Sequence, residues 1–143
     1  MDETEAPREL AIDSSKHPFY DELKSGRLLP ELKGYEMAYL FVIAMSYGVY
    51  YKKRKPIPPN KIKRSISKSF VEKEFEYLIK AVAISVSEEG VDIIPDKAKI
   101  YRIAEEYANG GIEIIEELIK KSRPGEFEID MEKELNKITK LKI

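Results

Sequence analysis

Positively charged side chains are concentrated in one short stretch of this 143-residue chain. The stretch from Lys52 to Lys68, called here the basic segment, contains eight Lys or Arg residues and no Asp or Glu. Such a density of cations suits phosphate groups or an acidic protein surface, because their summed positive potential attracts anions. The candidate binding residues are Lys52, Lys53, Arg54, Lys55, Lys61, Lys63, Arg64 and Lys68. A second interpretation stays open: these cations pair with acids of the same chain, for instance those between residues 113 and 134.

Glutamates are the other group that could carry chemistry, since clustered carboxylates bind Mg²⁺ in nucleases and phosphatases. The candidates are Glu105 with Glu106, Glu113 with Glu116 and Glu117, and Glu132 with Glu134. The competing interpretation is a solvated helix face balanced by nearby lysines, and it is the one that the pattern favours. The sequence therefore predicts no catalytic residue and no metal site.

The sequence lacks the residues that most other catalytic sites require. His17 is the single histidine, it precedes Pro18, and the chain has no cysteine. A zinc site of the usual ligands and a nucleophile activated by histidine are therefore not expected. The glycines fit neither a phosphate-binding loop nor a dinucleotide fingerprint, so no cofactor is predicted. These observations favour a protein that is not an enzyme.

A tyrosine-rich apolar stretch leads directly into the basic segment and is predicted to be a helix from about Glu31 or Gly34 to Lys53. At 100° per residue its tyrosines lie on one face, while Ala44 and Gly48 lie on the opposite face, where a second backbone can approach closely. A helix that is apolar on every side must be covered on every side. We therefore expect either a central core helix or a homo-oligomer interface that includes Tyr39, Ala44 and Gly48.

The apolar stretch is too short to span a membrane. Its uncharged part, Met37 to Tyr51, has 15 residues, whereas a crossing helix needs about 20. The N-terminus is acidic and lacks the apolar centre of a secretory signal, so a cytoplasmic location is expected. Charged residues make up 36% of the chain, a composition also found in ion-pair-rich proteins of thermophiles.

The remaining pattern predicts an all-α, single-domain bundle of about five helices around the central apolar helix. Residues 1–30 contain three prolines and no sustained period, so we expect a loosely ordered segment there, with one helical turn near Phe19 to Leu23, and a helical domain over 31–143. Three prolines between Pro56 and Pro59 require an extended connector. The other predicted helices run from Ser67 or Ser69 to Ser87, from Asp96 to Ala108, from Ile112 to Lys121 and from Met131 to Leu141, with stops at Asn109-Gly110-Gly111 and Pro124-Gly125.

Three of these patterns together resemble a known family. They are Phe41-x-x-Ala44-x-x-x-Gly48, Lys53-Arg54-Lys55-Pro56-Ile57, and Glu105-Glu106-Tyr107-Ala108-Asn109-Gly110-Gly111. This combination is similar to small proteins associated with DNA-phosphorothioation (dnd-type) modification and defence loci. The resemblance implies an association with DNA-handling systems, and it supplies no catalytic positions.

The sequence thus leads to a non-enzymatic helical accessory protein that binds nucleic acid, or a nucleic-acid-bound complex, through the basic segment. One alternative is an adaptor that docks an acidic protein surface on the same residues. A further alternative is a metal-dependent hydrolase that uses the clustered carboxylates.

Overall fold

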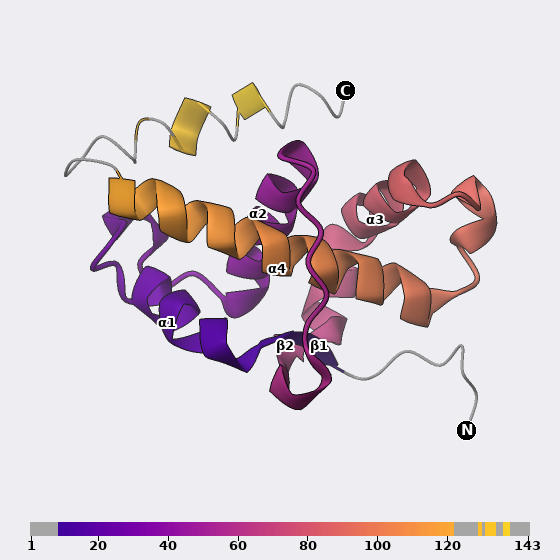
Figure 1. Cartoon of the computed structure of the whole chain (residues 1–143), viewed down its shortest axis with the longest axis horizontal. Helices are drawn as coiled ribbons and strands as arrows, with labels where there is room; N and C mark the ends of the chain where they lie inside the picture. The colour runs from indigo at the N-terminus through magenta and orange to yellow at the C-terminus, as the bar shows by residue number, and fades with distance from the viewer. Residues whose placement is uncertain (1–8, 122–128, 130, 134–135, 138–143) are drawn as a thin grey trace.

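The structure is a computed structural model, and it describes residues 9–121, 129, 131–133 and 136–137. The described part is helical apart from one small antiparallel sheet of two strands (Figure 1). This arrangement confirms the predicted all-α fold. The elements are β1 (Glu9–Asp13), α1 (His17–Ser25), α2 (Met37–Tyr50), β2 (Ile62–Ser67), α3 (Lys68–Val86) and α4 (Lys97–Lys121), joined by short 3-10 turns.

The core is built on α2 and α4, which cross in direct backbone contact. Helix α2 is the predicted central apolar helix, and Phe41, Ala44 and Met45 on it are completely buried. A Cβ atom added at Gly111 of α4 would lie 1.6 Å from the carbonyl oxygen of Ala44. One added at Gly48 would lie 2.0 Å from the carbonyl oxygen of Tyr107. The close approach expected at Ala44 and Gly48 therefore occurs within the chain, against α4.

Helix α4 runs without a break through Asn109-Gly110-Gly111, so the predicted helix stop at these residues is wrong. Neither glycine has a positive φ, unlike Gly26, which ends α1 in the left-handed conformation. A glycine inside a helix costs about 1 kcal/mol relative to alanine. Here the residues without a side chain are needed because another backbone lies where each Cβ would be.

The N-terminal region differs from the expected loose segment, because residues 9–30 contribute to the core. Strand β1 pairs with β2, and α1 extends the expected helical turn into a helix with Pro18 in its first turn. Leu10 of β1 and Tyr20 and Leu23 of α1 are almost completely buried. The strand was missed because its apolar run is only three residues long and its partner strand, with Lys63, Arg64 and two serines, has little apolar pattern of its own.

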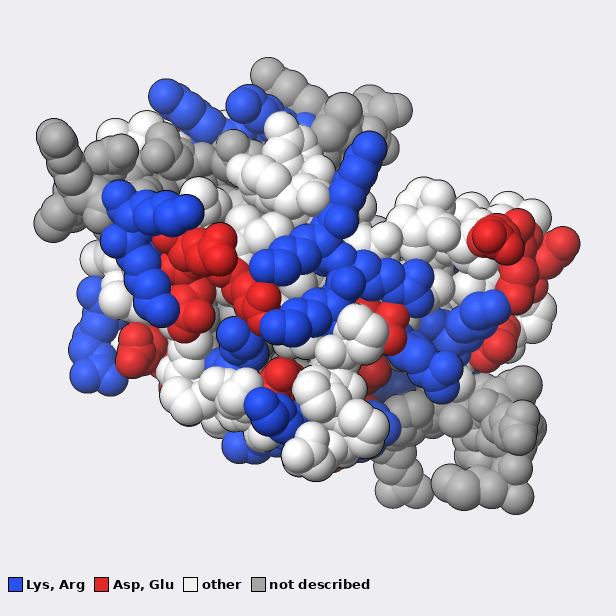
Figure 2. Space-filling view, viewed as in Figure 1, with Lys and Arg blue, Asp and Glu red and all other residues white. Residues whose placement is uncertain are grey.

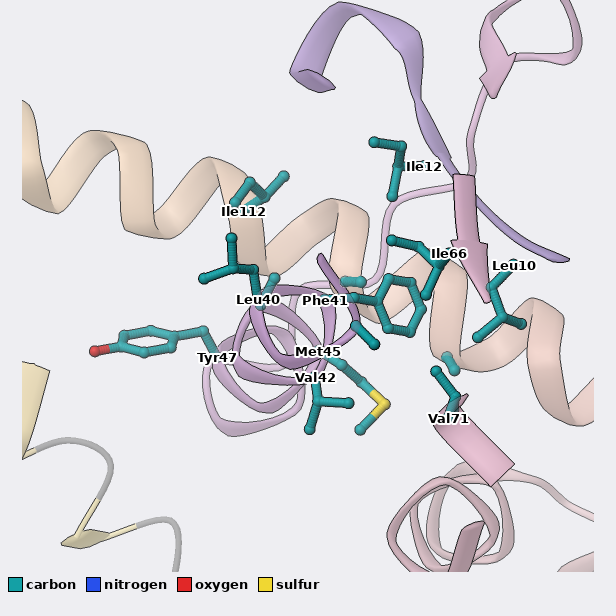
Figure 3. Close-up of a cluster of buried hydrophobic side chains, with 14 of the residues drawn as sticks. Leu10, Ile12, Leu40, Phe41, Val42, Met45, Tyr47, Ile66, Val71 and Ile112 are labelled. Carbon is teal, nitrogen blue, oxygen red and sulfur yellow. The ribbon is translucent and has the colours of Figure 1, made fainter. Parts of the chain in front are cut away.

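Side chains from all these elements gather in one cluster (Figure 3). The sheet contributes Leu10, Ile12 and Ile66, which join Phe41 of α2 and Val71 of α3. Burial of apolar side chains of this size is the main stabilising contribution to such a fold. The small sheet is therefore part of the core.

Helix α3 begins where Ser67 caps it by accepting a hydrogen bond from the Phe70 amide at 3.3 Å. Ser67 was one of the two starts expected. After α3 the chain forms the 3-10 turn Gly90–Ile93. The predicted stop at Pro124-Gly125 lies outside the described residues. Of the predicted helix from Met131 to Leu141, residues 131–133 and 136–137 are helical and the rest lies outside the described part.

Candidate functional site

The first half of the basic segment, residues 52–60, is called here the connector. It is extended around its prolines and crosses α4 (Figure 1). It starts at Lys52, whose φ of 57° turns the chain out of α2. The Lys55 amide then donates to the Glu106 carbonyl at 3.0 Å. The side-chain amide of Asn109 donates to the carbonyl oxygens of Lys55 and Pro56 at 3.1 and 3.4 Å. These bonds hold the connector backbone on the surface of α4.

Gly110 completes this attachment. A Cβ atom at Gly110 would lie 2.1 Å from the carbonyl oxygen of Lys53, so the connector rests on the helix where the side chain is missing. Asn109 is 3% exposed, and its role is not recognisable from sequence because Asn-Gly-Gly is also a typical helix stop. We call the connector, Glu106 and residues 109–113 of α4 the clasp.

Ion pairs reinforce the clasp. Arg54 Nε lies 2.7 Å from a carboxylate oxygen of Glu106, and Lys53 Nζ lies 3.0 Å from Glu113, which also binds Lys55. Lys16 approaches Glu113 to 3.5 Å. Burial raises the pKa of the Glu113 carboxyl, but the hydrogen bonds from Lys55 and Lys53 outweigh it and lower the pKa to about 2. Glu113 is therefore the ionic centre of the clasp.

The second half of the segment is paired less tightly. Arg64 on β2 lies 3.9 Å from Glu105, whose carboxylate accepts a hydrogen bond from the Ala11 amide at 2.6 Å. Burial raises the pKa of the Glu105 carboxyl, and that hydrogen bond and Arg64 oppose the change. Lys68 lies 4.0 Å from Glu72. Five of the eight candidate residues thus have an acid of the same chain within 4.0 Å.

The other three, Lys52, Lys61 and Lys63, are exposed and have no carboxylate within 4.0 Å among the described residues. Only four carboxylates of the described part lie within 4.0 Å of these eight cations, so positive charge remains in excess. Figure 2 shows Lys and Arg gathered across the middle of this face, with acidic side chains between them. Each interpretation of the sequence therefore describes some of these residues. Acids of the same chain pair with five of the cations, and the other three remain available to an anion.

The residues proposed for a homo-oligomer interface are occupied by contacts within the chain. Ala44 and Gly48 are buried against α4. Tyr39 is half-buried in an aromatic cluster with Tyr35, Phe70 and Phe75, whose ring centroids lie 5.2 to 6.0 Å away. The homo-oligomer stays a prediction, and a surface other than the Ala44 and Gly48 face of α2 would have to carry it.

Four of the carboxylates considered for metal binding, Glu105, Glu106, Glu113 and Glu116, are used in other contacts. Glu105 binds the Ala11 amide and Glu106 binds Arg54. Among the described residues, no group of three or more His, Asp or Glu side chains is placed to hold a metal ion. His17 lies 3.2 Å from Asp21 on α1. In the same part of the chain, no helix is both long and apolar enough to span a bilayer.

Fold and clasp together define a small all-α protein in which Glu106, Asn109 and Glu113 of α4 hold a basic connector. Residues 35–136 match the family described as DNA sulphur modification system-associated protein 4, and the chain belongs to this family. This result confirms the resemblance to dnd-associated proteins. The matched range includes both halves of the clasp, and each half contains one of the motifs that carried the resemblance. Comparisons with curated proteins and with solved structures gave no match.

Proposed function

We propose that this protein is a non-enzymatic accessory component of a DNA sulphur modification system, and that it contacts nucleic acid, or a nucleic-acid-bound complex, through the basic segment. The observation that carries the proposal is the surplus of cations over carboxylates on this segment. Lys52, Lys61 and Lys63 supply that surplus, since none of them has an acidic neighbour in the described part of the chain. Membership of a family named for DNA sulphur modification systems supports a partner that handles DNA.

The mechanism follows from the charge and from the clasp. Lysines that neutralise phosphates release condensed counterions, so affinity falls steeply as salt rises. Contacts to phosphate position a protein on the duplex but do not distinguish one base sequence from another. Asn109 and Glu106 fix the connector backbone after Lys52, and the ladder with β1 fixes Lys63, so the backbone that carries these cations is ordered before binding. We expect binding with little sequence preference.

The test is fluorescence anisotropy with labelled duplex DNA, single-stranded DNA and RNA over a series of salt concentrations. Replacing Lys52, Lys61 and Lys63 together by Gln should weaken binding and reduce the slope of log K against log salt by nearly 3, since each phosphate contact on duplex DNA contributes about 0.9. The matched control replaces Lys24, Lys33 and Lys121, which are exposed, lie outside the basic segment and have no ion pair with any described residue. Absence of binding to all three nucleic acids at low salt would exclude direct contact and leave a protein of the complex as the partner.

A further inference from the structure

The two-stranded sheet has one covered edge and one open edge. On β1, the Ala11 amide points away from β2 and donates to the Glu105 carboxylate of α4, so α4 occupies that edge. On β2, residues 62–64 are exposed. No backbone hydrogen bond other than those to β1 involves these three residues in the described part of the chain. Strand β2 is therefore the free side of the sheet.

The register identifies which backbone groups point outward. Ala11 is paired with Arg64, and because the Ala11 amide turns away from β2, this pair exchanges no hydrogen bonds. In an antiparallel ladder the N–H and C=O groups of Arg64 must then also point outward, and so must those of Ile62, two residues away. Lys63 between them pairs with Ile12 inside the ladder. Ile62 and Arg64 thus present donors and acceptors at the spacing that another strand requires.

The side chains along this edge determine which kind of strand could pair with β2. Lys61 and Lys63 have no acidic neighbour in the described region, and Ile62 is 46% exposed. Lysine on an edge strand is a common protection against pairing with a like strand. A second copy of β2 would bring these lysines together with Arg64 and be repelled. An extended acidic segment would meet opposite charges and cover Ile62.

We propose that the outer edge of β2 accepts an extended acidic strand from a partner protein by strand addition. Main-chain hydrogen bonds to Ile62 and Arg64 would supply the affinity, and Lys61 and Lys63 would select for acidic side chains. Lys61 and Lys63 take part in both proposals, but this inference does not depend on nucleic-acid binding, because the affinity for a strand comes from the backbone of β2.

The probe is a synthetic peptide of alternating Glu and Val residues, with binding measured by fluorescence anisotropy and by amide hydrogen exchange in NMR. The amides of Ile62 and Arg64 should gain protection, whereas the Lys63 amide, already in the ladder with β1, should change little. A peptide N-methylated on alternate residues keeps its charge and loses the donors, so it should bind about tenfold more weakly. A peptide with Lys in place of Glu should not bind measurably.

Variants of the protein provide a second measurement. Arg64→Pro removes an outward amide without removing a backbone bond to β1, while Arg64→Gln keeps the amide. Both variants lose the charge and the hydrogen bond that Arg64 Nη1 donates to the Glu9 carbonyl at 3.2 Å. We expect the proline variant to lose peptide binding and the glutamine variant to retain it, with Lys63 protection reporting that the sheet is intact. Unchanged exchange at Ile62 and Arg64, or equal binding of the N-methylated peptide, would overturn strand addition. Neither result bears on nucleic-acid binding, whose failure would appear only in the DNA and RNA titrations.

Discussion

At the scale of single residues, the contacts between distant segments depend on two kinds of position: glycines that leave room for another backbone, and a glutamate that binds several lysines. Gly48, Gly110 and Gly111 each face a backbone atom at a distance that no Cβ can occupy. Glu113 is surrounded by three lysines, two of which belong to the connector. Both features join segments that are distant in sequence, so a change at one residue should alter the contact between two elements.

Replacing Gly111 by Ala should destabilise the protein strongly. The new Cβ would lie 1.6 Å from the Ala44 carbonyl oxygen, so α2 and α4 would have to separate. We expect a loss of about 3 kcal/mol in the free energy of unfolding, at the upper end of the usual cost of overpacking. Gly34→Ala is the control: it has open space but a φ of 78°, and should cost about 1 kcal/mol. Urea denaturation measures both, and equal losses would contradict direct helix contact.

Glu113 should make stability depend on pH in the acid range. Its pKa is lowered in the folded protein to about 2, whereas an unfolded glutamate titrates near 4.3. A lowered folded pKa means that the stabilisation is complete above the unfolded pKa and is lost as pH falls from about 4 to about 2. Denaturation curves of Glu113→Gln should show a weaker pH dependence in this window. Glu117→Gln, at an exposed position on the same helix, should keep the dependence of the unmodified protein.

At the scale of elements, the connector and α4 behave as one unit. Three prolines remove backbone donors from the connector, which is compatible with an extended chain that bonds to α4 through Lys55 and its carbonyl groups. Asn109 is the residue of α4 that reaches the connector with its side chain. The family motifs at residues 53–57 and 105–111 therefore describe the two sides of one contact.

Removing the Asn109 side chain should release the connector. Asn109→Ala loses the hydrogen bonds to the Lys55 and Pro56 carbonyl groups, and a hydrogen bond typically contributes about 1 kcal/mol to stability. Limited trypsin digestion should then cleave faster after Lys52, Lys53 and Arg54. Asn60→Ala, at the exposed far end of the connector, is the matched control. Equal cleavage of both variants would mean that the ion pairs and the Lys55 backbone bond hold the connector without the Asn109 side chain.

Much at this scale could be predicted from the sequence, and the failures have physical causes. The apolar α2, the extended proline connector and the amphipathic α3 each follow from local pattern. The glycine pair of α4 was misread because a helix stop and a close helix contact use the same residue, and tertiary packing decides between them. Strand β1 and the pairing of Arg54 with Glu106 depend on partners about 50 residues away. Local pattern carries no information about contacts over that distance.

At the scale of the whole molecule, the charges divide into two sets. Lys53, Arg54 and Lys55 hold the clasp together and are neutralised by Glu106 and Glu113. The second set, Lys52, Lys61 and Lys63, has no such partners in the described part. A formal net charge of −1 hides this division, since the molecule carries mixed charge on the face of the clasp (Figure 2). Folding and binding should therefore respond to different lysines.

Charge reversal separates the two sets. Changing Lys53, Arg54 and Lys55 to Glu would place like charges beside Glu106 and Glu113, so the melting temperature should fall by several degrees, because about 1 kcal/mol corresponds to several degrees in a protein of this size. Changing Lys52, Lys61 and Lys63 to Glu should leave the melting temperature unchanged and abolish nucleic-acid binding. Calorimetry and anisotropy on the same samples test both expectations. If the first triple variant melts like the unmodified protein and loses binding, the clasp cations are functional, and the division of the charges into two sets is wrong.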